Sequence, residues 1–300
     1  MHRCLSVLIL FLVFSAVQSQ IKPNNTYNVP LLDFGPHPVN KSLLCSTPNC
    51  CPIALTFDDG PDGARGVSDV IIDYLHSHNI SSTFFMNSKN WVDVDMNPVA
   101  QKTVKNIVHF GFNLGTHTVH HKDLTNLSDA DIKYEITGVQ TTVDKFMSAS
   151  PRLSLFRAPF GNPYNTATQV QMDIVSKIAA DAGYLHVAWQ IDPSDYACGN
   201  NITCVTDPIF RAVDEGQWGI IILHFIHNNT ANALPSLIAG LRQRRCEFFT
   251  VEQFVQAKYG QSSADVMDDY NRKSNATFTS PSTFIMIIFT FYIVFLYFSK

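Results

Sequence analysis

The chain of 300 residues is predicted to be an α/β protein in which helices cover a parallel sheet. Short apolar runs alternate about seven times with longer amphipathic stretches, which is the pattern of strand–helix units in a parallel sheet. Polar side chains recur where these runs end, and α/β folds bind ligands at the carboxyl ends of their strands. A doubly wound sheet and a β/α barrel both fit this rhythm, and the chain is long enough for a barrel.

The predicted strands are short and rich in apolar residues, and they lie at 53–57, 82–86, 112–117, 153–159, 185–192, 219–225 and 247–251. Longer amphipathic stretches between them are expected to be helices, at 66–78, 98–110, 128–147, 166–182, 207–214 and 231–244. Ser128 stands before an acidic, amphipathic segment and is expected to cap the helix that follows it.

The N-terminus has the pattern of a secretory signal peptide. Arg3 precedes an apolar run that is followed by small residues, so residues 1–19 are expected to be removed. The apolar run is short for a membrane anchor, which disfavours that alternative. Residues 20–50, rich in Pro and Asn, are expected to form an irregular lead-in.

The C-terminus ends in a second apolar run, at 284–298, which is short for a bilayer span. A polar spacer and small residues at 274–276 precede it. We therefore expect 277–300 to be a glycosyl-phosphatidylinositol attachment signal that is removed, and a retained single-span anchor is the alternative. Residues 259–276 are expected to be a polar linker.

Other features also favour the secretory pathway. Asn-x-Ser/Thr acceptors begin at Asn24, Asn40, Asn79, Asn126, Asn201, Asn228 and Asn275. The charge is balanced, with 21 basic and 25 acidic residues and a net charge of −4. Because there is no basic stripe, we expect no nucleic-acid partner.

The cysteines predict disulfides. Six remain once Cys4 leaves with the signal peptide, an even number in an oxidising compartment. Cys198 and Cys204 bracket a short loop and are expected to pair with each other. Cys246 is expected to pair with a cysteine near the start of the domain, and spacing does not choose among Cys45, Cys50 and Cys51.

The segment TFDDGP ends the first apolar run with two adjacent carboxylates, Asp58 and Asp59. Asp, Gly and Pro are turn residues, so a simple turn is one interpretation. The other is that one carboxylate binds a cation while its neighbour acts as a base.

The segment HTVHH follows another strand and contains His117 and His121. If the chain turns helically here, their spacing of four places both imidazoles on one face. With Asp59 they would form a His₂Asp set that leaves positions open for water or substrate, as in catalytic metal sites. Chance is the alternative, because the chain has 11 histidines.

Three further strand ends carry polar groups. Arg157 is either a surface residue before a turn or a guanidinium that holds a carboxylate and lowers its pKa. Asp192 ends the strand at 185–192, and Asp195 follows it. His224 ends a very apolar run and is either a core residue or a general acid.

These motifs, in this order, resemble those of the polysaccharide deacetylases, the NodB-homology or carbohydrate esterase family 4 domain that includes chitin deacetylases. The matching segments are TFDDGP, HTVHH, RAPFG, DPSDY and ILH, over about 52–257. The resemblance implies a distorted β/α barrel of about seven strands, with one catalytic domain at 51–258. It also implies metal-dependent removal of N-acetyl groups from a glycan.

The resemblance assigns roles around the cation. Asp58 matches the catalytic base and Asp59 a metal ligand, with His117 and His121 completing the ligand set. Arg157 matches the residue that holds the base. The implied metal is Zn²⁺ or a similar divalent ion such as Co²⁺.

The resemblance also assigns the groups that act on the substrate. His224 matches the general acid and Asp192 the carboxylate that tunes it. The backbone N–H of Phe160 matches the oxyanion donor. Tyr196 and Ile222 stand where the family more often has Trp and Leu, on the wall of the acetyl pocket.

The leading functional prediction is a surface-anchored, monomeric chitin deacetylase that yields chitosan and acetate. A deacetylase or esterase for chitooligosaccharides or acetylxylan is the alternative within the same class. A catalytically weak wall-binding protein on the same fold is the alternative outside it. His120, an extra imidazole in the second motif, is expected to point away from His117 and His121.

Overall fold

The computed structural model describes residues 29–32, 39–163 and 168–278. The signal peptide expected at 1–19 and nearly all of the attachment signal expected at 277–300 lie outside these ranges. Within the described ranges, no helix is both long enough and apolar enough to cross a bilayer.

One parallel sheet forms the centre of the molecule, in the strand order β1-β6-β5-β4-β3-β2-β7, with β8 also paired to β2. The strands are β1 (Leu31–Leu32), β2 (Cys51–Asp58), β3 (Ser82–Met86), β4 (Asn113–Thr116), β5 (Leu155–Phe156), β6 (Leu185–Val187), β7 (Gly219–His224) and β8 (Cys246–Phe248). An isolated parallel bridge between Ile191 and Ile221 joins the segment after β6 to β7. Strands β2 to β6 lie side by side in chain order, and β7 pairs with the other side of β2. Because the Ile191–Ile221 bridge also brings the segment after β6 to β7, the sheet curls until its two ends nearly meet. This confirms a distorted barrel instead of a doubly wound sheet.

The central strands form where the sequence is most continuously apolar. Every residue of β2 and β3 is buried, and the first five residues of β7 are buried as well. Parallel strands covered on both faces need such runs, because neither face meets water. In the register of β2 and β7, Asp58 pairs with His224, so two motif residues share one strand end.

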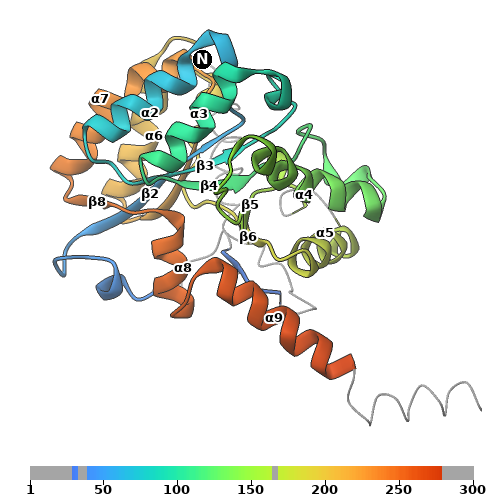
Figure 1. The fold of residues 1–300 in the computed structure, drawn as a ribbon. Coiled ribbons are helices and arrows are strands. Elements are labelled where there is room, and N and C mark those ends of the chain that lie inside the picture. The colour runs from blue at the N-terminus through green and yellow to red at the C-terminus, as the bar shows by residue number, and fades with distance from the viewer. Residues whose placement is uncertain (1–28, 33–38, 164–167, 279–300) are drawn as a thin grey trace, which may run out of the picture.

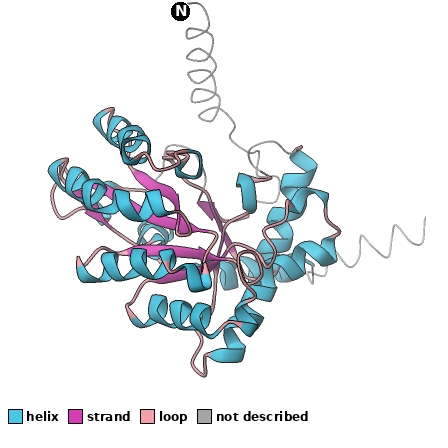
Figure 2. Cartoon of the chain, turned by 90° about the horizontal axis from the view of Figure 1, so that it is seen from above, coloured by secondary structure: helices cyan, strands magenta, loops and turns pink. Residues whose placement is uncertain are grey.

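Helices surround the sheet (Figure 1, and Figure 2 from above). They are α2 (Val67–Ser77), α3 (Pro98–His109), α4 (Asp129–Phe146), α5 (Gln169–Asp181), α6 (Ile202–Asp214), α7 (Asn228–Gln243), α8 (Val251–Tyr259) and α9 (Ser263–Phe278). In Figure 1, α2, α3, α6 and α7 lie on one side, and α4 and α5 lie on the other. Ser128 caps α4 as predicted, since its hydroxyl accepts from the N–H of Asp131 at 3.3 Å.

The prediction of a polar linker at 259–276 is wrong. This segment forms α9, which packs against α5, α8 and β6. Val266 and Met267 are buried in the core beside α8, and Arg152 forms an ion pair with Asp268 at 2.7 Å. A few apolar side chains on one face suffice to dock a helix whose remaining residues are polar.

The lead-in expected at 20–50 is partly ordered within the described ranges. Leu31 and Leu32 add a short parallel strand beside β6, and Leu32 is fully buried. The pairing was not apparent from sequence, because two apolar residues are too few to show a strand pattern.

The predicted Cys198–Cys204 disulfide is confirmed. A second bond joins Cys45 to Cys50. The bond expected for Cys246 is not formed. Cys246 and Cys51 are instead buried free thiols in register on the adjacent strands β8 and β2.

Candidate metal centre and active site

Three predicted metal ligands converge at the carboxyl ends of β2 and β4. Asp59 follows β2 with a left-handed backbone (φ 80°), and His117 follows β4. Asp59 Oδ1 lies 3.4 Å from His117 Nε2 and 3.1 Å from His121 Nε2. The three ligand atoms lie within 4.8 Å of one another, close enough for one cation.

The helical turn considered at 117–121 is not formed. The segment is irregular, with positive φ at Thr118 (77°) and His121 (55°). Asn87 Nδ2 donates to the carbonyls of His117 and Thr118, and the N–H of His121 donates to Thr118 Oγ1 at 3.1 Å. These bonds replace the helical ladder and still bring the two imidazole centroids to 4.9 Å.

His120 faces away from the other two histidines, as expected. Its Nδ1 contacts Oε1 of Glu135 at 2.9 Å, and its backbone N–H donates to Oε2 at 2.8 Å. Glu135 is buried on α4. This carboxylate therefore anchors the histidine loop to α4, a role that the sequence did not indicate.

The ligand set fits a divalent cation. His117 Nδ1 lies 2.8 Å from the carbonyl oxygen of Arg157, which can only accept, so Nδ1 carries a proton and Nε2 is the nitrogen that faces Asp59. Burial, helped by the nearby His117, lowers the pKa of His121 to about 4 and leaves that imidazole neutral near pH 7. Asp59 Oδ1 is buried and has no hydrogen-bond partner among the described residues. Two imidazoles and one carboxylate are the donor set of a catalytic metal site with open positions.

Asp58 and Arg157 form a buried ion pair beside this site. Arg157 Nη1 donates to Asp58 Oδ1 at 2.7 Å, and it also donates to Thr56 Oγ1 at 2.7 Å. The guanidinium donates further to the carbonyls of Val187 and Ala188. Asp58 Oδ2 is buried without a hydrogen-bond partner among the described residues and lies 3.8 Å from His117 Nε2. One carboxylate oxygen is thus held while the other remains available as an acceptor.

The predicted pairing of Asp192 with His224 is wrong, because Asp195 makes that contact. Asp195 Oδ1 lies 2.6 Å from His224 Nδ1, and Oδ2 accepts the backbone N–H of His224 at 2.9 Å. Burial alone would lower the pKa of His224, but the bond to Asp195 and the nearby carboxylates outweigh it and raise the pKa to about 9. His224 is therefore protonated near neutral pH.

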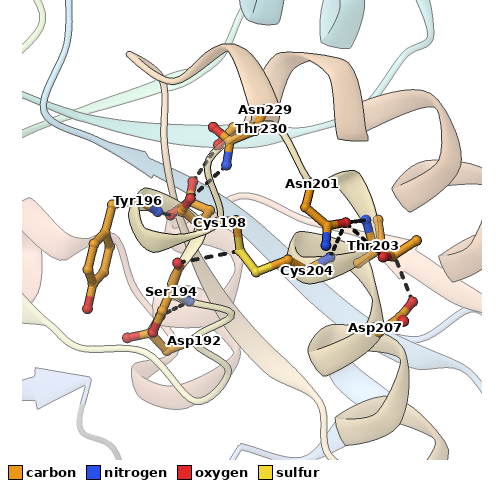
Figure 3. The surroundings of a disulfide bond; sticks show 12 residues. Asp192, Ser194, Tyr196, Cys198, Asn201, Thr203, Cys204, Asp207, Asn229 and Thr230 are labelled. Carbon is orange, nitrogen blue, oxygen red and sulfur yellow. Dashed lines mark hydrogen bonds between the residues drawn. A yellow bond between two sulfur atoms is a disulfide. The ribbon is translucent and has the colours of Figure 1, made fainter.

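Asp192 instead shapes the loop after β6. Its Oδ1 accepts from the N–H of Ser194 at 2.7 Å, and Ser194 has a left-handed backbone (φ 53°). Figure 3 shows Asp192 beside Ser194, on the opposite side of the loop from Asn229 and Thr230. This turn directs the next aspartate, at position 195, toward β7. Both aspartates stood in the same sequence motif, and spacing alone did not distinguish them.

The remaining predicted site residues lie around the same strand ends. Phe160 has a left-handed backbone (φ 60°) and is 59% exposed, and its ring packs edge-on against His121. Tyr196 is 61% exposed, and its ring packs edge-on against His224. Ile222 lies two residues before His224 on β7 and is buried in the core cluster that contains Trp189.

The site places a candidate metal-ligand set beside a carboxylate with a free oxygen, at one edge of a curled parallel sheet. Residues 46–184 match the sequence model of the family described as polysaccharide deacetylase. This part of the chain is therefore similar to the polysaccharide deacetylases, as the motifs predicted.

Relatives and solved structures agree with this family. The chain is 28% identical over 206 residues to a peptidoglycan-N-acetylglucosamine deacetylase of Listeria monocytogenes, covering 69% of this chain but 39% of that protein. It is 29% identical to one of Bacillus cereus, covering 69% of this chain and 89% of the relative. The structure of a chitin deacetylase from the fungal pathogen Colletotrichum lindemuthianum aligns with a TM-score of 0.58 at 25% identity, covering 70% and 88% of the two chains.

Proposed function

We propose that this protein is a metal-dependent polysaccharide N-deacetylase that hydrolyses N-acetyl groups of N-acetylglucosamine units. One observation carries the proposal. A His₂Asp ligand set lies next to a carboxylate with a free oxygen, Asp58, and that carboxylate is in register with a protonated imidazole, His224. Amide hydrolysis needs this combination of an electrophile site, a base and an acid.

The base side of the mechanism rests on Asp58. A divalent ion bound by Asp59, His117 and His121 would polarise the acetyl carbonyl and make water more acidic. Asp58 Oδ2 then accepts a proton from the attacking water. Arg157 orients the Asp58 carboxylate through its bond to Oδ1.

The acid side rests on His224. Its imidazolium donates a proton to the sugar nitrogen as the carbon–nitrogen bond breaks, because an amide anion is a very poor leaving group. Asp195 stabilises the imidazolium through Nδ1 and leaves Nε2 for this transfer. We assign the Phe160 backbone N–H to the developing oxyanion. The products are acetate and a glucosamine unit.

Chitin is the substrate that we propose, with chitosan as the product. The signal-peptide pattern, the glycosylation acceptors and the anchor-like tail favour a eukaryotic cell surface, where chitin is the N-acetylated wall polymer. The similarity to a fungal chitin deacetylase structure supports the same substrate. The curated relatives named above act on peptidoglycan, so peptidoglycan is the competing substrate, followed by chitooligosaccharides and acetylxylan.

We further propose secretion as a monomer and attachment to the plasma membrane or cell wall through a glycosyl-phosphatidylinositol anchor. The Cys45–Cys50 and Cys198–Cys204 disulfides support an oxidising compartment. Zn²⁺ is the proposed metal, because it prefers imidazole and carboxylate ligands in tetrahedral sites with an open position.

Acetate release tests the proposal. The full chain, expressed in a secreting eukaryotic host, is assayed with chitin oligomers, peptidoglycan and acetylxylan, after chelation and again with Zn²⁺ restored. We expect release from chitin oligomers that requires metal and falls about 10²- to 10⁴-fold in Asp58→Asn. Asp73→Asn, a charge change on an exposed residue of α2, is the control. Zn²⁺ binding without release from any of these glycans would favour a wall-binding protein.

A further inference from the structure

We propose that Thr230 is a positioning residue of the acid side, which holds the Asp195 carboxylate against His224. The inference rests on the proposed function, in which His224 is the general acid. Thr230 Oγ1 donates to Asp195 Oδ2 at 2.5 Å, and Thr230 is 1% exposed. Neither the motifs nor their spacing pointed to this residue.

The contacts of Asp195 show why the hydroxyl matters. Oδ1 accepts from the ring Nδ1 of His224 and from the N–H of Tyr196 at 3.0 Å. Oδ2 accepts from the N–H of His224 and from Thr230. An ionised carboxylate offers about four lone-pair positions, so Thr230 fills the last one. Without the hydroxyl, a buried charged oxygen would lose a donor that water has little room to replace.

Asn229, the residue before Thr230, holds Asp195 through the Asp195 backbone carbonyl. Asn229 Nδ2 donates to the Asp195 carbonyl at 2.7 Å, and Asn229 is also buried. Both residues lie in the first turn of α7, and Figure 3 shows them beside the segment that carries Tyr196 and Cys198. The Cys198–Cys204 disulfide ties that segment to α6. The short 3-10 turn that begins at Asp195 is therefore held from two helices, and its carboxylate has little freedom to rotate.

The position of Thr230 complicates a simple mutation. Asn228, Asn229 and Thr230 form an Asn-x-Thr glycosylation acceptor, and Asn228 is exposed. Thr230→Val removes the hydroxyl and the acceptor together, whereas Thr230→Ser keeps both. Asn228→Gln removes only the acceptor and therefore isolates the effect of any glycan.

A second control measures the effect of losing a hydrogen bond from a buried threonine that lies away from the site. Thr103 on α3 is buried, and its Oγ1 donates to Asp69 Oδ1 on α2 at 2.8 Å, between two covering helices. Thr103→Val thus removes the same kind of hydroxyl–carboxylate bond between elements that carry none of the site residues.

The experiment compares these variants of the full chain, loaded with Zn²⁺, by two readouts. The first is acetate release from N-acetylglucosamine oligomers. We expect kcat to fall about 10-fold in Thr230→Val with little change in KM, because part of the general-acid contribution is lost. Thr230→Ser, Asn228→Gln and Thr103→Val should stay near the wild-type rate.

The second readout does not depend on activity. The short imidazole–carboxylate bond of His224 should give a low-field proton resonance, identified by its loss in Asp195→Asn. We expect this resonance to weaken or vanish in Thr230→Val and to persist in Thr230→Ser and Thr103→Val. If no glycan is deacetylated, this resonance alone decides the inference. Persistence of the resonance in folded Thr230→Val, or a kcat equal to that of Thr103→Val, would overturn it.

Discussion

The Arg157 guanidinium and the Asp58 carboxylate form an ion pair that is almost fully removed from solvent, with side chains 0% and 1% exposed. The pair orients the candidate base, and it also joins β2 to the segment after β5. Because the pair links two parts of the fold, a stability measurement can report on it separately from an activity measurement.

Removing one partner of this pair should destabilise the fold. We expect Arg157→Ala to lower the free energy of unfolding by about 3–5 kcal/mol, because it leaves the buried Asp58 carboxyl group without its partner. Urea denaturation followed by circular dichroism measures the change. Arg152→Ala is the matched control, because its ion pair with Asp268 is about half exposed and should matter far less. Equal losses in the two variants would contradict the prediction.

The pH dependence should identify the partner of His224. The acid must be protonated, so activity is present below the pKa of His224, about 9, and is lost as pH rises through it. In Asp195→Asn the bond that raises this pKa is weakened and the effect of burial remains. We therefore expect the alkaline limb of kcat/KM to move to lower pH.

Asp192→Asn is the control for that profile. Its carboxylate bonds to Ser194 and makes no hydrogen bond to His224, so the alkaline limb should stay near that of the wild type. A shift in Asp192→Asn without one in Asp195→Asn would restore the assignment that the sequence favoured.

Metal affinity should depend on two of the three clustered histidines. We expect His117→Gln and His121→Gln each to weaken Zn²⁺ binding by more than about 100-fold, since loss of a direct ligand exceeds the 10- to 100-fold cost of losing its supporting partner. His120→Gln should bind nearly as the wild type does, because that imidazole contacts Glu135. Calorimetric titration of the chelator-treated protein measures all three. Strong Zn²⁺ binding by His121→Gln would argue against the ligand set.

The free thiols of Cys51 and Cys246 should become a disulfide in the secreted protein. They are in register on adjacent parallel strands, whose spacing of about 4.8 Å lies within the Cα range of disulfides. Mass spectrometry of unreduced peptides should find the two cysteines linked, with a loss of two hydrogens. Complete alkylation of both thiols after denaturation would show that they stay reduced.

Local sequence was sufficient for the central strands and most site residues. The run at 82–86 is predicted and observed as the same strand, because a buried parallel strand needs continuous apolar residues and leaves a clear pattern. Five candidate site residues were identified because each lies at or just beyond a strand end, where parallel strands bring side chains together. They are Asp58, Asp59, His117, Arg157 and His224.

Only the tertiary structure decided which of two chemically equivalent residues contacts His224. Asp192 and Asp195 lie three residues apart, and the left-handed turn at Ser194 selects Asp195 for His224. Thr230 and Glu135 reach the site loops from helices, through contacts 35 and 15 residues distant in sequence, respectively. Such long-range contacts produce no periodic pattern in the local sequence, whereas a buried strand is recognised from its consecutive apolar residues. The sequence by itself thus determined an α/β fold and the candidate residues at its strand ends, and long-range packing determined how the acidic and hydroxyl groups are shared among their partners.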